Sequence, residues 1–330
     1  MAQVDPVEDL KATLQEMCAQ LRDDQVPYEF IEGFSLEDFR PKLVKAVQKI
    51  GLNAKRICVH FSAPPIPTPA EAAAVIACMK KACIDVLAVF AELPRSQGRT
   101  LRRDVSGHLK ELYDAVMDLV SVINSESDRC LQVAGKLWEK CHGIERISKD
   151  NKEAVRGVLS THYDFIQDAV NELRESMEEN EALALDLQHM PARNGLNQPR
   201  FTWSLQERAL LNPGIGLANT FRITMRKVIA AVDIYGRCIN RQENEELDKI
   251  ADLFRVSSSF MDDFVTTLYP PVTAAAVQEY GATLKAHVLK MLDATRDSHF
   301  HNTDEEDWVN FLEHAIEHNY QNLLSRIDDL

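Results

Sequence analysis

The sequence predicts an all-α fold. Apolar residues recur at spacings of three and four along nearly all of the 330 residues, whereas the sustained alternation that marks strands is absent. Hydrophobic residues make up 45% of the composition, which is enough apolar surface for a substantial core. Amphipathic helices joined by short links bury that surface by packing side by side. We therefore expect about ten helices in two antiparallel bundles of four to five helices each.

The first two helices are expected in the N-terminal quarter of the chain. One spans residues 5–23, where Asp5 can accept hydrogen bonds from free amides and Pro6 needs no donor at the first helical position. The next begins near Ser35 and ends in the proline-rich segment 63–67, which predicts a rigid connector. The apolar face of this second helix comprises Phe39, Leu43, Ile50, Ala54, Ile57 and Phe61.

Capping patterns mark the next two helices. Thr68 and Glu71 have the spacing of a capping box, and Pro94 ends the helix that they open. Gly98 supplies a turn, and Thr100 is expected to cap the following helix. The inward residues of the two helices are Val75, Met79, Val86 and Phe90, and then Val105, Leu109, Leu112, Val116, Leu119 and Ile123.

A short helix over 128–142 precedes a long one that Asp150 and Glu153 open. The short helix carries Leu131, Leu137 and Trp138 on its apolar face. The apolar face of the long helix comprises Val155, Leu159, Phe165, Ile166, Val170, Leu173 and Met177.

The clearest domain boundary lies at residues 188–203, which contain Pro191, Gly195 and Pro199 among polar neighbours. This places one helical bundle in residues 1–187 and a second in residues 204–330. The polar link that follows the first helix leaves a second arrangement open, in which residues 5–23 join the second bundle instead.

Helical patterns in the second half cover 204–240, 243–269 and 272–297, with breaks at Pro213-Gly214 and Pro270-Pro271. A last helix is expected to begin at Thr303, which forms a capping-box pattern with Glu306. Its apolar face comprises Trp308, Phe311, Ile316, Leu323 and Ile327.

The charge and the cysteines narrow the class of function. There are 37 Lys and Arg against 51 Asp and Glu, and a net charge of −14 argues against nucleic acid as a partner.

The seven cysteines include no CxxC pair, and most lie on apolar stripes, so we expect reduced thiols. The chain starts with neither a basic nor an apolar run and contains no apolar stretch of about 18 residues. We expect neither secretion nor a membrane span.

Five strings of residues give the chain a family resemblance. They are LPRSQGRTLRR at 93–103, ISKDNKEAV at 147–155, DFIQDAVNEL at 164–173, LYPP at 268–271 and EDWVNFLEHAI at 306–316. In this order and spacing they resemble the cyclin-D-interacting (GCIP) family over most of the chain. Each string also lies at a helix end, a turn or a cap, where backbone geometry constrains the sequence.

The resemblance implies binding to D-type cyclins and to adaptor proteins, restraint of cyclin-dependent kinase signalling toward the retinoblastoma protein, and residence in the cytoplasm and the nucleus. It also implies bundles similar to those of talin-like cytoskeletal proteins. Family members are described as helix-loop-helix proteins without a basic region, which implies helix-loop-helix partners. Here the apolar stripes continue along the whole chain and favour bundle core over an isolated module of that kind.

Two short motifs could carry a site. His314, Glu317 and His318 form an HxxEH pattern, in which two imidazoles one turn apart could hold zinc beside a general base. Ala315 and Ile316 within it belong to the apolar stripe, so a solvated histidine pair is the favoured interpretation. His299 and His301 could complete such a site only if a loop folded back. We expect no catalysis, metal or cofactor.

The second motif, Arg208-Ala209-Leu210-Leu211, matches the Arg-x-Leu-apolar pattern that cyclin hydrophobic patches accept. An exposed Trp203 would strengthen this docking interpretation, and burial of the leucines would favour core packing instead. Arg99-Thr100-Leu101 is a weaker copy. The sequence thus predicts a non-enzymatic regulatory protein that binds a D-type cyclin and adaptors and restrains the cell cycle. A cytoskeletal or adhesion-type scaffold is the alternative.

Overall fold

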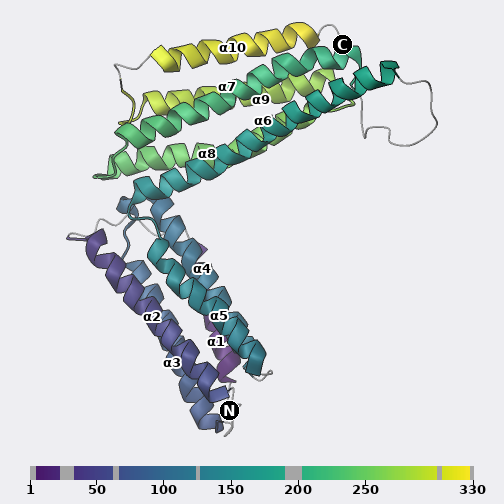
Figure 1. Cartoon of the computed structure of the whole chain (residues 1–330). Coiled ribbons are helices and arrows are strands. Elements are labelled where there is room, and N and C mark those ends of the chain that lie inside the picture. The colour runs from purple at the N-terminus through teal and green to yellow at the C-terminus, as the bar shows by residue number, and fades with distance from the viewer. Residues whose placement is uncertain are drawn as a thin grey trace. The chain divides into compact units, whose positions relative to one another are not determined.

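The computed structural model describes residues 5–22, 33–61, 67–123, 127–189, 203–302 and 307–327 (Figure 1). These described residues form ten α-helices and two short 3-10 helices, and they contain no strand. The chain divides into two compact units, residues 1–154 and 155–330. The predicted all-α class is confirmed.

The first unit contains five of the helices. They are α1 (Pro6–Arg22), α2 (Leu36–Phe61), α3 (Pro69–Ala91), α4 (Arg99–Ser121) and α5 (Ser127–Gly143), with 3-10 turns η1 (Arg95–Gln97) and η2 (Ile144–Arg146). Two ion pairs show that α2 and α3 run antiparallel, because Lys42 Nζ lies 3.4 Å from Glu92 Oε2 and Lys49 Nζ lies 3.1 Å from Asp85 Oδ2. α1 packs against α3 and α4, so residues 6–22 belong to the first unit.

Three predicted helix starts have the expected hydrogen bonds. At α1 the Val7 amide donates to Asp5 Oδ1 over 3.0 Å. At α3 the Glu71 amide donates to Thr68 Oγ1 over 3.3 Å, and the Thr68 amide donates back to Glu71 Oε2 over 2.8 Å. The Glu153 amide donates to Asp150 Oδ1 over 2.8 Å. Each such cap stabilises its helix by roughly 0.5–2 kcal/mol.

The predicted cap of α4 was wrong. The N-cap is Gly98, whose φ of 109° suits glycine, and Thr100 lies buried inside the first turn. The acceptor for the Leu101 amide is Asn151 Oδ1, at 2.9 Å. A Cβ at position 98 would lie 2.0 Å from Asn151 Cγ, so glycine makes room for a cap from a distant residue.

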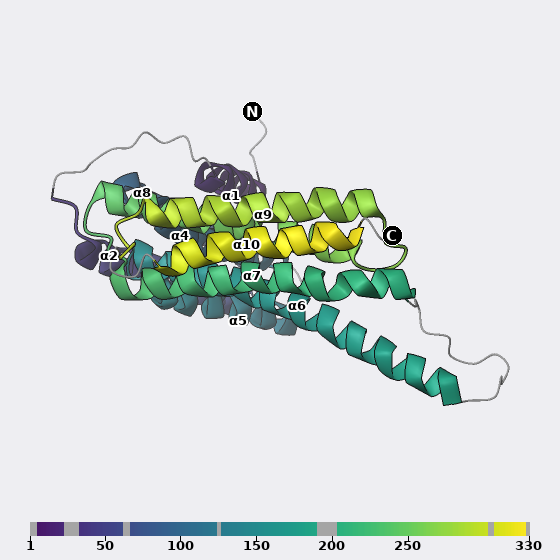
Figure 2. The ribbon, with the colours of Figure 1, turned by 90° about the horizontal axis from the view of Figure 1, so that it is seen from above.

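The second unit contains α6 (Asn151–His189), α7 (Leu205–Tyr235), α8 (Arg241–Thr267), α9 (Ala274–Arg296) and α10 (Asp307–Ile327), although the first turn of α6 belongs to the first unit. α10 packs on α7 and α9, and α8 packs on α9 (Figure 2). The two compact units thus divide near Ala154, whereas the sequence analysis placed the boundary at 188–203. Residues 190–202 of the predicted boundary lie outside the described residues, and the apolar face of α6 packs in the second core from Val155 onward.

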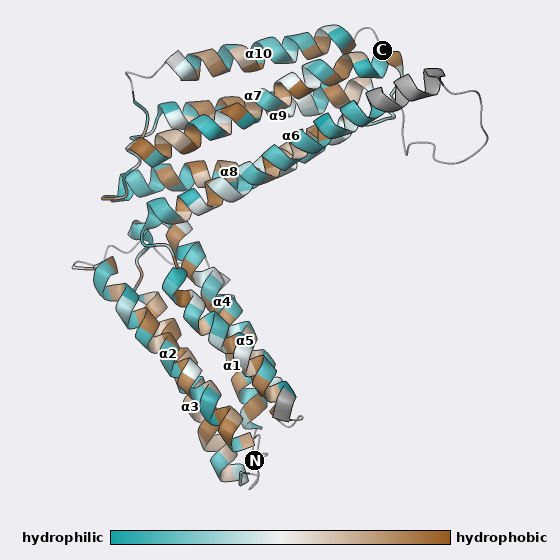
Figure 3. Cartoon of the chain, in the orientation of Figure 1, coloured by the Kyte–Doolittle hydropathy of each residue, from teal (hydrophilic) through white to brown (hydrophobic). Residues whose placement is uncertain are grey.

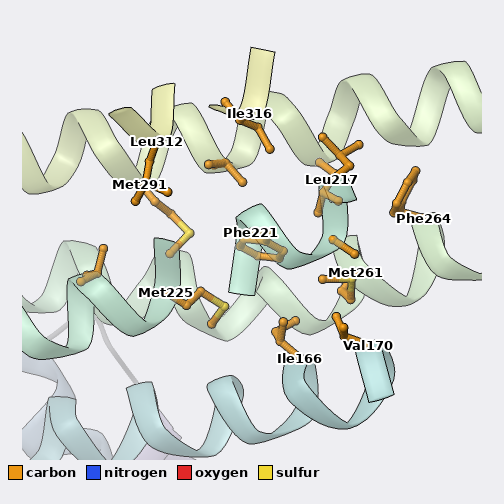
Figure 4. Packing of buried hydrophobic residues seen from close by; sticks show 14 of the residues in the cluster. Ile166, Val170, Leu217, Phe221, Met225, Met261, Phe264, Met291, Leu312 and Ile316 are labelled. Carbon is orange, nitrogen blue, oxygen red and sulfur yellow. The ribbon is translucent and has the colours of Figure 1, made fainter. Parts of the chain in front are cut away.

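Buried side chains from all five helices fill the centre of the second unit (Figure 4). The ring of Phe221 lies among them, between α6 on one side and α10 on the other. Apolar and polar residues alternate around most helices, as the hydropathy colouring shows (Figure 3). The labelled core residues are Ile166, Val170, Leu217, Phe221, Met225, Met261, Phe264, Met291, Leu312 and Ile316.

Several details differ from the sequence-based expectations. Leu131, Phe165 and Phe311 were expected in the core, but all three are exposed. α7 continues through Pro213 without a break, and its Gly214 lets Leu268 approach so closely that a Cβ would lie 2.7 Å from Leu268 Cδ1. The predicted cap at 303–306 lies outside the described residues.

The described helices are too short or too polar to cross a lipid bilayer. All seven cysteines lie in the described part of the chain, where no disulfide joins them. Cys58 Sγ and Cys130 Sγ lie 3.9 Å apart in the first core. Burial and the neighbouring Cys130 raise the pKa of the Cys58 thiol to about 12, so it stays protonated at neutral pH.

Candidate partner-binding surface

Trp203 lies in a buried corner of the second unit. Only 3% of its surface is exposed, and its Nε1 donates to the Leu268 carbonyl over 2.7 Å. Its ring lies 5.6 Å from the ring of Tyr269. These contacts attach the start of α7 to the residues that follow α8, so Trp203 has a structural role in the second unit.

The remaining residues of the predicted docking motif also make contacts within the fold. Leu210 and Leu211 are 1% and 2% exposed, and Arg208 Nη2 donates to Asn180 Oδ1 on α6 over 2.9 Å. A docking motif must place its leucines in the groove of a partner, which buried leucines cannot do. This burial corrects the docking interpretation and favours core packing. The weaker copy shares this placement, because Thr100 and Leu101 are buried.

Glu207 strengthens the same corner. It forms a capping box with Ser204, and its Oε1 also accepts the Val272 amide over 3.0 Å. Burial alone would raise the pKa of this carboxyl group, but the amides of Ser204 and Val272 outweigh burial and lower it. The carboxylate therefore stays charged and joins α7 to the segment before α9.

The HxxEH residues lie on the solvent side of α10. His314 Nδ1 contacts the Asn310 carbonyl over 2.7 Å, and His318 Nε2 contacts Asn322 Nδ2 over 3.0 Å. Glu317 pairs with Lys285 at 3.0 Å, and hydrogen bonds from Gln321 and Lys285 lower its pKa. These contacts match a solvated helical face.

His299 is held in a separate network. Its Nδ1 lies 2.6 Å from Glu246 Oε2, and its Nε2 accepts the Arg237 amide over 2.9 Å. Across the described residues, no three His, Cys, Asp or Glu side chains gather closely enough to hold a metal ion.

A groove between α2 and α3 is a surface that the sequence analysis missed. It has a volume of about 330 Å³. Four residues from each helix line it at helical spacings, so it follows both helix axes. The lining residues are Lys49, Leu52, Asn53, Arg56, Cys78, Lys81, Ala82 and Asp85.

Asn53 joins the two walls of this groove. Its Nδ2 donates to the Lys49 carbonyl over 3.0 Å and to the Cys78 carbonyl on α3 over 3.3 Å. Its Oδ1 accepts from Arg56 Nη1 over 3.3 Å. Asn53 is buried, so this amide fixes both helices and orients the arginine.

The groove is more basic than the chain that carries it. α2 holds six Lys and Arg residues against two Asp and Glu, and both acids lie in its first turn. The whole chain has a net charge of −14. This signal is present in the sequence, as the basic residues on the polar face of α2.

Comparison with known proteins places the chain in a family. Residues 42–179 match the family model described as Grap2 and cyclin-D-interacting, N-terminal. The zebrafish (Danio rerio) cyclin-D1-binding protein 1 homolog is 33% identical over 300 residues, which cover 88% of this chain and 87% of that protein. The chain belongs to the cyclin-D-interacting family.

Other members of the family align over nearly the whole chain. The Xenopus laevis cyclin-D1-binding protein 1 homolog is 27% identical across 96% of this chain and 97% of its own length. Human cyclin-D1-binding protein 1 is 26% identical across 98% of this chain and 94% of its own length. Family membership, predicted from five strings, is confirmed. The matched residues 42–179 include most of α2 and all of α3, and therefore both walls of the groove.

Proposed function

We propose that this chain is a non-enzymatic regulatory protein that binds a D-type cyclin and thereby restrains cell-cycle progression. The observation that carries the proposal is the 33% identity to a cyclin-D1-binding protein 1 homolog over 88% of the chain. The fold is consistent with it, because bundles of long helices offer helical faces and grooves to a protein partner. The family model's description supports Grap2-like adaptors as further partners.

Direct binding tests this proposal. The full chain is immobilised, and a purified D-type cyclin is passed over it alone and in complex with its kinase. We expect saturable binding with a Kd of about 1 μM or tighter, which corresponds to about −8 kcal/mol. A cyclin of another class is the control for specificity. The absence of saturable binding at concentrations of roughly 100 μM would overturn the proposal.

A kinase assay tests the regulatory part separately. If the chain withholds the cyclin, its addition lowers the rate at which the cyclin-bound kinase phosphorylates a protein substrate. The rate should fall in proportion to the fraction of cyclin bound in the direct assay. An unchanged rate at saturating chain would leave cyclin binding in place and reject restraint. Localisation to cytoplasm and nucleus belongs to the same proposal, and cell fractionation tests it.

A further inference from the structure

The α2–α3 groove has an apolar seam open to solvent. Leu52 on α2 is 61% exposed, and Val59, two turns further on, is 64% exposed. Cys78, which lines the groove from α3, is exposed as well. Residues seven positions apart lie on one line of a helix, so Leu52 and Val59 form one edge of the seam. Large apolar side chains arranged in a line are typical of a surface that anchors a partner helix.

Basic side chains accompany this seam. Lys49 is paired with Asp85 across the groove, at 3.1 Å. Arg56 and Lys81 are exposed, and no carboxylate of the described residues lies within ion-pair distance of either. Arg56 donates instead to the neutral amide of Asn53. The groove therefore presents two positive charges that no carboxylate of the described residues neutralises. The chain as a whole is strongly acidic.

The seam has the length of a short helix. Lys49, the first lining residue of α2, and Val59 are ten residues apart, and at 1.5 Å per residue they span about 15 Å. A partner helix of about 15 residues covers that span. Its apolar residues would need the spacing of i, i+3 and i+7 to follow the seam between two helices.

We propose that the α2–α3 groove binds an acidic amphipathic helix of a partner protein. The apolar face of that helix packs on Leu52, Val59 and Cys78, and its carboxylates pair with Arg56 and Lys81. Charge complementarity selects the partner, because a basic helix meets repulsion at both side chains. The inference names the surface that the proposed cyclin binding would use, and it rests on that proposal only for the partner's identity.

A designed peptide tests the groove by itself. The probe is a fluorescein-labelled amphipathic helix of about 15 residues, with leucines at i, i+3 and i+7 spacing and flanking glutamates. Fluorescence anisotropy measures its binding to the full chain. We expect Arg56→Glu combined with Lys81→Glu to weaken binding by about tenfold or more, because each reversal replaces attraction by repulsion. Raising the salt concentration should weaken wild-type binding and narrow the difference.

A matched variant separates local from global charge. Arg129→Glu combined with Lys136→Glu makes the same change in net charge at exposed positions of α5 that do not line the groove. Its affinity should stay within about twofold of wild type. An equal loss of affinity for the acidic peptide in both double variants would overturn the inference. A peptide with lysines in place of the glutamates should not bind, and binding as tight as that of the acidic peptide would overturn it too.

A second pair tests the apolar seam without changing charge. Leu52→Ala combined with Val59→Ala removes two exposed side chains and disturbs no buried group. We expect binding to weaken about tenfold with the salt dependence retained. Leu131→Ala on α5, also exposed, is the control. Circular dichroism establishes that each variant is folded. Unchanged peptide affinity in the double variant would overturn the assigned seam.

The cyclin assay distinguishes this inference from the proposed function. If wild type binds the cyclin and the groove variants do not, the proposed cyclin binding and the groove as its site are both supported. If all variants bind the cyclin equally, the groove is overturned as its site while cyclin binding stands. If wild type binds the acidic peptide through the groove but not the cyclin, the groove stands and the proposed partner falls. Sedimentation showing a groove-dependent dimer would overturn the partner helix in favour of a second copy.

Discussion

His287 makes the second unit sensitive to acid. It is 4% exposed on α9, with Ser257 Oγ 3.0 Å from its Nε2 and the ring of Phe260 4.4 Å from its own. Burial lowers its pKa from 6.5 to about 4, with a smaller contribution from Lys290, against a hydrogen bond toward Leu253 that raises it. The folded unit therefore keeps this imidazole neutral at pH values where the unfolded chain binds a proton.

The size of the effect follows from the two pKa values. Above pH 6.5 both states hold His287 neutral, so stability does not depend on this proton. As the pH falls from 6.5 toward 4, the unfolded state gains the proton first, and stability falls by about 1.4 kcal/mol per pH unit. Between pH 7 and pH 5 the loss amounts to about 2 kcal/mol. Below pH 4 both states are protonated and the loss stops growing.

Urea unfolding of a His287→Gln variant measures this contribution. Glutamine can still donate to Ser257 but does not titrate. Trp138→Phe in every sample leaves Trp203 and Trp308, both in the second unit, as the fluorescence probes. We expect wild type to lose about 2 kcal/mol more than the variant between pH 7 and pH 5. Exposed His318→Gln is the control and should behave like wild type. Equal acid sensitivity in wild type and His287→Gln would refute the reasoning.

Three further substitutions test other parts of the structure. Gly98→Ala should destabilise the first unit by about 2 kcal/mol or more in urea unfolding, because φ is 109° and Asn151 occupies the space, and a stability equal to wild type would contradict this. Trp203→Phe should cost about 1–3 kcal/mol by circular dichroism, since the Leu268 carbonyl loses its donor; a neutral effect would show that this bond contributes little. Replacing both His314 and His318 by Ala should change stability by less than about 0.5 kcal/mol and leave the zinc content unchanged in elemental analysis. Stoichiometric zinc in wild type but not in the variant would reject the interpretation of a solvated histidine pair.

Local patterns in the sequence predicted the helices well. Thr68 and Glu71 form their capping box because both partners lie within four residues of each other, where sequence spacing determines geometry. Gly98 and Asn151 show the limit of such patterns. The cap of α4 comes from a side chain about fifty positions away, and no spacing rule within one helix can find it.

The candidate site was harder to predict because a short motif does not reveal burial. Leu210 and Leu211 match a docking pattern and a core stripe equally well, and only the packing of α7 against its neighbours distinguishes them. Leu52 and Arg56 illustrate the opposite case. Their exposure depends on which face of α2 is covered, and one face is covered by α3 and α5 while the groove side is left open. The distribution of basic residues along α2 was the available clue.

The acidity of the chain and the basic groove act over different distances. At physiological ionic strength charges more than about 8 Å apart are largely screened, so a partner at a distance meets only a weakened repulsion from the net charge of −14. In contact, Arg56 and Lys81 lie within a few ångströms of its carboxylates and dominate the interaction. A strongly acidic protein can therefore bind an acidic helix, provided that the basic residues are gathered on one groove. The excess of acids elsewhere then disfavours other acidic surfaces, which makes the groove selective as well as attractive.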